Sequence, residues 1–345
     1  MSKNYQTIKF LNYLRVYNTI KMGIKHLNSF LLENCGPRSI YKANLRQFAN
    51  KTLVIDTSIY LYKFAEKNAV PENMYLLISV FRKHNITPVF VFDGKPPPEK
   101  KQLLIKRKIE KDAAEERYNA LKTLGETTSK EMETLKRQFV RVTESDILKS
   151  KEIMRACGVP YIESRGESDG LCALLVKHGF AWACVSDDMD MFLYGCPRVI
   201  RHLSLLHNEC SYYDTESILN DLDMSQDAFN DIAILSGTDY NIHNKQSLSE
   251  TVRLYMRYRE WLHSNSGVGT KYQERTFCQW LIDNTDCIND QFQFERIRKM
   301  FDLVEFFKNN REEFKIVVDK MPFQVGEYSA AELHRVLKSE GFLFA

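Results

Sequence analysis

The chain has 345 residues, of which 44% are hydrophobic, so it can bury a substantial core in one large domain or two. Its net charge of +3 excludes no class of partner, because binding to a polyanion depends on how the charge is distributed. No apolar run approaches the roughly 18 residues that span a bilayer, so we expect no membrane segment. Basic residues gather in two places: residues 1–32 contain no acid, and residues 95–111 hold seven Lys or Arg against two Glu.

The N-terminus and the cysteines bear on where the protein acts. The first 21 residues are expected to be an N-terminal extension before Met22, although Met22 is an alternative start, and a mitochondrial presequence is an alternative interpretation of this basic segment. The eight cysteines are scattered without a CxxC pair, which favours reduced thiols in an intracellular protein. We expect a location in the nucleus, or in the cytoplasm if the protein is viral.

Short apolar runs alternate with helical patterns in the first half of the chain, which is typical of an α/β fold with a mostly parallel central sheet flanked by helices. The expected strands are TLVID (52–56), TPVFVFD (87–93), VPYIES (159–164), AWACVS (181–186) and PRVIRHL (197–203). Two of these strands end in Asp56 and Asp93, and Asp188 follows a third. Because the carboxyl ends of parallel strands meet at one edge of the sheet, we expect these acids to converge there.

A long insertion at about residues 100–150 is rich in Glu, Lys, Arg, Leu and Ala, and it predicts two or three helices with a break at Gly125. Its first part has few large apolar residues, so we expect it to arch over solvent or a ligand. A solvated helix pair without function is the alternative. Residues 241–345 have helical patterns and few strand signals, and they predict a mainly helical C-terminal region.

Acidic side chains beside the expected strand ends form the candidate site. Each one alone could be a helix cap or a turn residue, but together they would repel one another unless cations neutralise them. Oxygen ligands without a His or Cys cluster favour Mg²⁺ or Mn²⁺ over zinc, and two such ions would suit the hydrolysis of a phosphodiester. Nearby basic side chains would then contact the phosphate. The acids are Asp56, Asp93, Glu167, Asp169, Asp188, Asp190 and Asp239, and the basic residues are Lys100, Lys101, Lys106 and Arg107.

Six segments in this order and spacing resemble the flap endonuclease family of structure-specific 5′ nucleases. They are MGIKHL, VIDTSIYLY, VFDGKPP, the ExD in GESDGLCALLVKHG, SDDMDMFLYG and LSGTDY. The resemblance spans about residues 22–240, which it implies to be a nuclease core with a PIN-like fold and a helical arch at about 100–150. It also implies a divalent-metal-dependent nuclease that hydrolyses branched or flapped DNA near junctions of single and double strands, in replication, repair or recombination.

The resemblance assigns roles to individual residues. It implies that Asp56, Asp93, Glu167 and Asp169 lie nearer one of two ions, and that Asp188, Asp190 and Asp239 lie nearer the other or are reached through water. Lys100 and Arg107 match the basic pair that reaches the scissile phosphate, and Tyr62 matches the tyrosine on which a terminal base stacks. Gly23, Lys101 and Lys106 are expected to contact DNA, and a single-stranded 5′ end is expected to pass through the arch.

The sequence departs from the family pattern at several points. Asp169 stands where the family usually has Glu, which could shift a metal ion. The family's glycine-rich turn between two helices, which grips duplex DNA around a monovalent cation, is replaced after Asp239 by NIHNKQSLSETVRLYMRY. The chain has no clear sliding-clamp motif, and we expect a monomer. A catalytically silent scaffold that binds nucleic acid and a 5′ exonuclease acting on RNA are the alternative functions.

Overall fold

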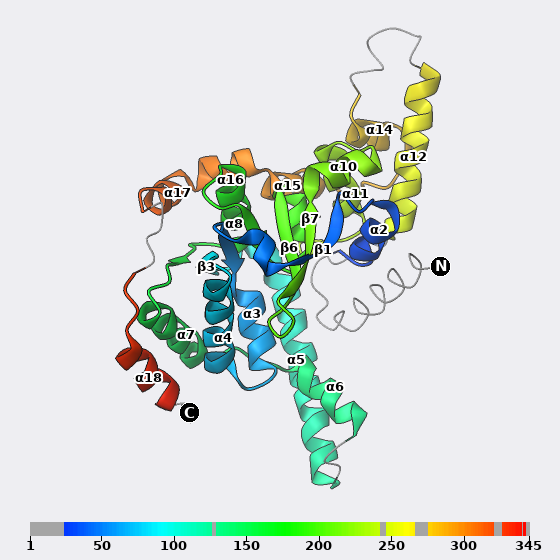
Figure 1. Cartoon of the computed structure of the whole chain (residues 1–345). Helices are drawn as coiled ribbons and strands as arrows, with labels where there is room; N and C mark the ends of the chain where they lie inside the picture. Colours follow the sequence, from blue (N-terminus) through cyan, green and yellow to red (C-terminus); the bar gives the residue numbers. More distant parts are fainter. Residues whose placement is uncertain are drawn as a thin grey trace, which may run out of the picture. The chain divides into compact units, whose positions relative to one another are not determined.

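The computed structural model describes residues 24–125, 129–241, 246–265, 275–320, 326–339 and 341–342. Internal contacts divide the chain into two compact units. Unit 1 contains the described residues of Met1–Ala43, Asp187–Ser204 and Glu209–Asn309. Unit 2 contains those of Asn44–Ser186, Leu205–Asn208 and Asn310–Ala345. Figure 1 shows the elements coloured along the sequence.

Strands of the described residues form a seven-stranded sheet in the order β1-β7-β6-β5-β2-β3-β4. In unit 2, β2 runs parallel to both β3 and β5, and β3 runs parallel to β4. In unit 1, β6 and β7 are antiparallel. The strands are β1 (Ile40–Asn44), β2 (Thr52–Asp56), β3 (Thr87–Phe92), β4 (Tyr161–Glu163), β5 (Ala183–Val185), β6 (Arg198–Ser204) and β7 (Glu209–Asp214). The predicted α/β class with a mostly parallel sheet is therefore confirmed.

The central strands of unit 2 are buried on both faces. In β2 and β3 every residue after the first threonine is buried, which explains why these strands are continuous apolar runs and do not alternate with polar residues. Helices α3, α4 and α8 contact these strands. The register places Asp56 opposite Val91, so β2 and β3 end close to the same level of the sheet.

The helices of unit 2 include a long hairpin. Helix α5 buries only Leu103 and Ala114, and α6, which packs against it, buries Met132 and Leu135. Figure 1 shows this pair as a projecting teal element, which agrees with the predicted helical insertion. The helices of unit 2 are α3 (Thr57–Ala65), α4 (Val70–Lys83), α5 (Lys101–Thr123), α6 (Lys130–Gln138), α7 (Glu144–Ala156), α8 (Ser168–Lys177), α17 (Arg311–Val318) and α18 (Ala330–Ser339), with 3-10 turns η1 (Leu45–Phe48) and η2 (Pro98–Lys100).

Polar caps begin several helices of unit 1. Asp214, Ser225 and Asp290 each accept a backbone N–H of the following helix, and Thr276 forms a capping box with Gln279. The helices are α2 (Leu27–Asn34), α9 (Asp190–Leu193), α10 (Thr215–Leu222), α11 (Gln226–Leu235), α12 (Leu248–Asn265), α14 (Phe277–Asn284), α15 (Gln291–Phe301) and α16 (Leu303–Asn309).

The last described residues, which belong to unit 2, are bonded to the end of α7. The Gly326 N–H donates to the Gly158 carbonyl at 2.7 Å, and the Ser329 N–H donates to the Ala156 carbonyl at 2.8 Å. The region beyond 241 is helical in the part that the structure describes, as predicted, while the predicted domain boundary at residue 240 stays a prediction. Within the described ranges, no helix combines the length and apolar character that crossing a bilayer requires.

Candidate active site

Asp56 lies at the carboxyl end of β2, where it is also the N-cap residue of α3. Only 4% of its surface is exposed. The hydroxyl of Ser186, which follows the parallel neighbour β5, donates to Asp56 Oδ2 at 2.9 Å. A buried carboxylate is costly unless hydrogen bonds or cations compensate for lost hydration. The Ser186 hydroxyl supplies part of that compensation and holds the carboxylate at this edge of the sheet.

Asp93 follows β3 and is exposed. Its Oδ1 accepts the N–H of Ser168 at 2.7 Å, and Ser168 is the first residue of α8. The first N–H groups of a helix have no partner within the helix, so an acid at this point is favourable. Asp93 therefore stabilises the beginning of α8 from a different strand.

A close contact of two backbones joins the loop after β3 to the loop between β4 and α8. The Gly94 N–H donates to the Gly166 carbonyl at 2.7 Å, and the Lys95 N–H donates to the Arg165 carbonyl at 3.0 Å. A Cβ atom at Gly94 would lie 2.1 Å from the carbonyl oxygen of Ser164. Only glycine fits there, which gives the Gly in the DGKPP segment a steric reason.

Glu167 and Asp169 lie at the N-terminus of α8, as the N-cap residue and a first-turn residue. Lys100, at the end of η2, forms an ion pair with Glu167 through Nζ and Oε1. Both side chains are mostly buried, with 10% and 16% exposed, so water screens this pair less than a surface pair. The structure thus joins Asp93 to the beginning of α8 and Lys100 to Glu167, within unit 2.

The remaining predicted acids belong to unit 1. Asp188 and Asp190 are buried, with 9% and 1% exposed, and the Asp190 N–H donates to Asp188 Oδ1 at 3.0 Å. Asp239 is half-buried in the turn after α11. The role of all seven acids as one ligand set stays a prediction.

Arg201 is a buried residue that was not selected from the sequence. Its guanidinium donates to the backbone carbonyl of Asp187 at 2.7 Å, and the His202 N–H donates to Asp187 Oδ1 at 2.6 Å. Arg201 also donates to Asn28 Oδ1 at 2.5 Å. These contacts hold the segment that leads into Asp188. An arginine in a predicted strand is expected to face solvent, so nothing in the sequence indicated that this one is buried.

The carboxylates suit a hard divalent ion by their chemistry. Side chains of Asp and Glu, without His or Cys among them, are the ligands that Mg²⁺ and Mn²⁺ prefer. Burial of Asp56 and Asp169 favours a compensating cation, because isolated buried charges are costly. Among the residues that the structure describes, however, no group of three or more His, Cys, Asp or Glu side chains is already arranged around one metal position.

The basic residues predicted to contact DNA lie on α5, close in sequence to η2. Lys101 and Lys106 are exposed, and Arg107 is half-buried. Tyr62 is 42% exposed, and Lys111 Nζ lies 4.9 Å from the centre of its ring. Burial lowers the pKa of Lys111, with smaller contributions from Arg141 and Arg107. Lys111 was not selected from the sequence, although its position four residues after Arg107 puts it on the same helix face.

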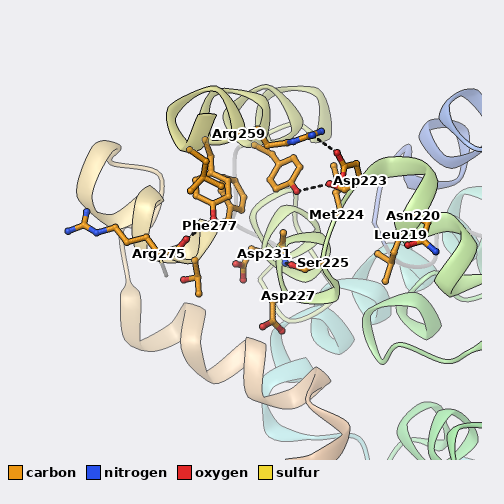
Figure 2. Close-up of a pocket in the computed structure, with 15 residues that line it drawn as sticks. Leu219, Asn220, Asp223, Met224, Ser225, Asp227, Asp231, Arg259, Arg275 and Phe277 are labelled. Carbon is orange, nitrogen blue, oxygen red and sulfur yellow. Dashed lines mark hydrogen bonds and ion pairs between the residues drawn. The ribbon is translucent and has the colours of Figure 1, made fainter. Parts of the chain in front are cut away.

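Gly23, predicted to contact DNA, lies outside the described residues. Helices α11 and α12 lie before and after Asp239 in sequence, and residues 242–245 between them are outside the described residues. Helix α11 packs against α12, with the Ser236 and Thr251 hydroxyls 2.7 Å apart. Figure 2 shows a pocket of about 620 Å³ in unit 1, lined by residues of α10, α11, α12 and α14. Tyr255 donates there to the Asp223 carbonyl at 2.9 Å, and no predicted site residue lines the pocket.

Comparisons with known proteins agree with this architecture. The family model of the XPG N-terminal domain matches residues 22–114, and that of the XPG I-region matches residues 158–239. Flap endonuclease 1 of Glycine max is 32% identical over 239 residues, which cover 64% of this chain and 62% of that protein. The chain therefore spans less than two thirds of the length of this relative.

Solved structures show the same fold. The catalytic core of Rad2 in complex with DNA substrate is similar with a TM-score of 0.64 and 20% identity, covering 93% of this chain and 96% of that chain. Flap endonuclease-1 from Methanococcus jannaschii is similar with a TM-score of 0.52 and 21% identity, covering 92% and 100%. Both family models include predicted site acids, the first Asp56 and Asp93 and the second the other five. The chain belongs to the XPG/flap endonuclease family.

Proposed function

We propose that the protein is a divalent-metal-dependent, structure-specific DNA nuclease. It would hydrolyse a phosphodiester near a junction of single and double strands in branched or flapped DNA. Its family membership, a relative named Flap endonuclease 1 and a fold neighbour solved with DNA substrate support this proposal. Such DNA arises in replication, repair and recombination, so we propose that it acts in the nucleus, or in the cytoplasm if the protein is viral.

The observation that carries the proposal is the arrangement at the N-terminus of α8. Asp93 accepts the Ser168 N–H, Lys100 pairs with Glu167, and Asp169 is buried in the same first turn. A structural helix cap needs one acid, whereas this helix start has three with a lysine beside them. Such a group suits the binding of a cation and a phosphate better than it suits helix capping alone.

We propose all seven acids as ligands of two Mg²⁺ or Mn²⁺ ions, with Asp56, Asp93, Glu167 and Asp169 nearer one of them. Asp188, Asp190 and Asp239 would lie nearer the other. Bound ions would supply a water activated for attack and neutralise the charge of the leaving oxygen. The protein's part is to hold the carboxylates: Ser186 holds Asp56, and the Ser168 N–H holds Asp93.

Lys100 would exchange its partner during the reaction. Its ammonium now neutralises Glu167, and a divalent ion on that carboxylate would leave the ammonium available for the scissile phosphate. Arg107 would provide a second cation for the same phosphate. The exposed ring of Tyr62 would stack on a terminal base without preference for sequence.

Cleavage of labelled DNA tests the proposal. The parent protein should cleave a 5′ flap in a Mg²⁺-dependent way, and the Asp188→Ala variant should lose this activity. Asp227→Ala is the matched control, because Asp227 is an exposed acid in the first turn of α11, in the same unit. A matched RNA flap, a gapped duplex and a blunt duplex complete the panel.

Asp188→Ala protein that cleaves as well as the parent would contradict the metal assignment. Preferred cleavage of the RNA flap would favour a 5′ exonuclease acting on RNA. DNA binding by the parent without cleavage in either metal would favour a silent scaffold.

A further inference from the structure

The residues of 164–167, here called the Glu167 loop, connect β4 to α8 and determine where Glu167 lies. One side of this loop is bonded to the chain that follows β3. The Ser164 N–H donates to the Phe92 carbonyl at 3.0 Å, and the carbonyls of Arg165 and Gly166 accept from Lys95 and Gly94. The N–H of Arg165 takes no part in these bonds with the β3 side.

Glu313 provides the acceptor for this N–H. Its Oε1 accepts the Arg165 N–H at 2.9 Å, although 148 residues separate the two in sequence. Glu313 lies in the first turn of α17, and only 8% of its surface is exposed. A hydrogen bond to a carboxylate is stronger than one to a neutral acceptor, and partial burial protects it from water.

Phe314, the residue after Glu313, packs α17 against the chain that follows α8. Phe314 is buried, and its ring centre lies 5.4 Å from that of His178 and 5.9 Å from that of Phe180. His178 and Phe180 directly follow α8. Helix α17 therefore contacts the chain both before and after the helix that carries Asp169.

We infer that Glu313 is a positioning residue for the carboxylates of Glu167 and Asp169. It fixes the Glu167 loop through a bond separate from those to the chain after β3, so that two segments hold the loop. The consequence is that Glu313 tightens the binding of the divalent ion, and this consequence rests on the proposed function. Glu313 lies outside the segments that the two family models match.

Loss of Glu313 would remove the acceptor of the Arg165 N–H, while the bonds to the chain after β3 would remain. The carboxylates would then spend more time away from the geometry that suits an ion. Residues that orient ligands without touching the metal change metal affinity by roughly 10- to 100-fold.

Amide hydrogen exchange of the metal-free full chain tests the contact itself. In Glu313→Ala, the Arg165 amide should exchange about tenfold faster or more, the size expected for a lost charge-assisted hydrogen bond. Glu313→Gln keeps an oxygen acceptor and should stay within about threefold of the parent. Glu312→Ala is the matched control, since it removes the adjacent, exposed acid from the same first turn.

Binding of Mn²⁺, followed by the paramagnetic resonance of the free ion, tests the consequence. Glu313→Ala should bind roughly tenfold more weakly, while Glu313→Gln and Glu312→Ala should match the parent. The inference would be overturned if the Arg165 amide exchanged equally fast in the parent and in Glu313→Ala. It would also be overturned if Glu313→Gln exchanged as fast at Arg165, or bound Mn²⁺ as weakly, as Glu313→Ala. Amide exchange is measured without metal or DNA, so its result does not depend on whether the protein cleaves DNA. A failed cleavage assay would contradict the proposed function and leave the Glu313 contact untouched.

Discussion

Replacing Gly94 by alanine would place a methyl group at the contact between the loop after β3 and the Glu167 loop. The added Cβ would lie 2.1 Å from the carbonyl oxygen of Ser164 and 2.4 Å from that of Arg165. Both obstacles are backbone atoms, which cannot rotate away as the end of a side chain can. The two loops would have to separate by about 1 Å to reach the 3.0 Å of the shortest ordinary contacts.

That separation would break the bonds from Gly94 to Gly166 at 2.7 Å and from Lys95 to Arg165 at 3.0 Å. Each backbone hydrogen bond contributes about 1 kcal/mol net, and inserting a methyl group into a packed contact costs about 1–3 kcal/mol. We therefore expect the free energy of unfolding to fall by roughly 3–5 kcal/mol. A shift of about 1 Å in groups that bind the substrate costs roughly 100-fold in rate.

Gly166→Ala is the matched control, because a Cβ at Gly166 would meet no atom within 4 Å. It makes the same chemical change in the partner loop, one residue before Glu167. Urea denaturation would give the stabilities, and single-turnover cleavage of a 5′ flap would give the rates. If Gly94→Ala and Gly166→Ala matched each other in both measurements, the close approach of the two loops would be refuted.

The other predictions concern separate contacts. Burial raises the pKa of Asp231 from 3.8 to about 7 despite its ion pair with Arg298. Between about pH 4 and pH 7 its carboxyl is therefore protonated in the folded chain and ionised in the unfolded chain. The free energy of unfolding should therefore fall as pH rises from about 4 to about 7, and Asp231→Asn should flatten this slope in urea denaturation; equal slopes would contradict it. Tyr62→Ala should weaken binding of a single-stranded 5′ end by about tenfold in fluorescence anisotropy, and Tyr62→Phe should not; a Phe variant as weak as Ala would count against stacking. Ser186→Ala removes the hydroxyl donor of Asp56 and should weaken Mn²⁺ binding by roughly tenfold, which calorimetric titration measures; unchanged affinity would show that the hydroxyl does not orient this ligand.

The sequence predicted the strands that carry the site because their local pattern is strong. The predicted segments at 52–56 and 87–93 correspond to β2 (Thr52–Asp56) and β3 (Thr87–Phe92), buried strands with continuous apolar runs. Two strands of the described residues were not predicted, β1 (Ile40–Asn44) and β7 (Glu209–Asp214). Both segments mix polar with apolar residues, and β7 lies between β1 and β6 in the sheet, so pairing with neighbouring strands stabilises them more than their local pattern does.

The sequence did not predict the contacts between distant segments. Lys100 was selected for its charge, but nothing in the pattern indicated that it would pair with Glu167, 67 residues later. Glu313 looked like one of several acids in a charged helix, and its burial depends on how α17 packs against the end of α8. Helical periodicity identifies the buried face of a helix but not the element that covers it.

Counting bound ions tests the central claim most directly, which is that acids far apart in sequence bind divalent ions together. Mn²⁺ titration of the metal-free chain should give two ions for the parent, and fewer or weaker ions for Asp93→Asn and for Asp188→Asn. Asp227→Asn, which changes an exposed acid outside the proposed ligand set, should match the parent. Unchanged stoichiometry and affinity in both Asp93→Asn and Asp188→Asn would contradict the account.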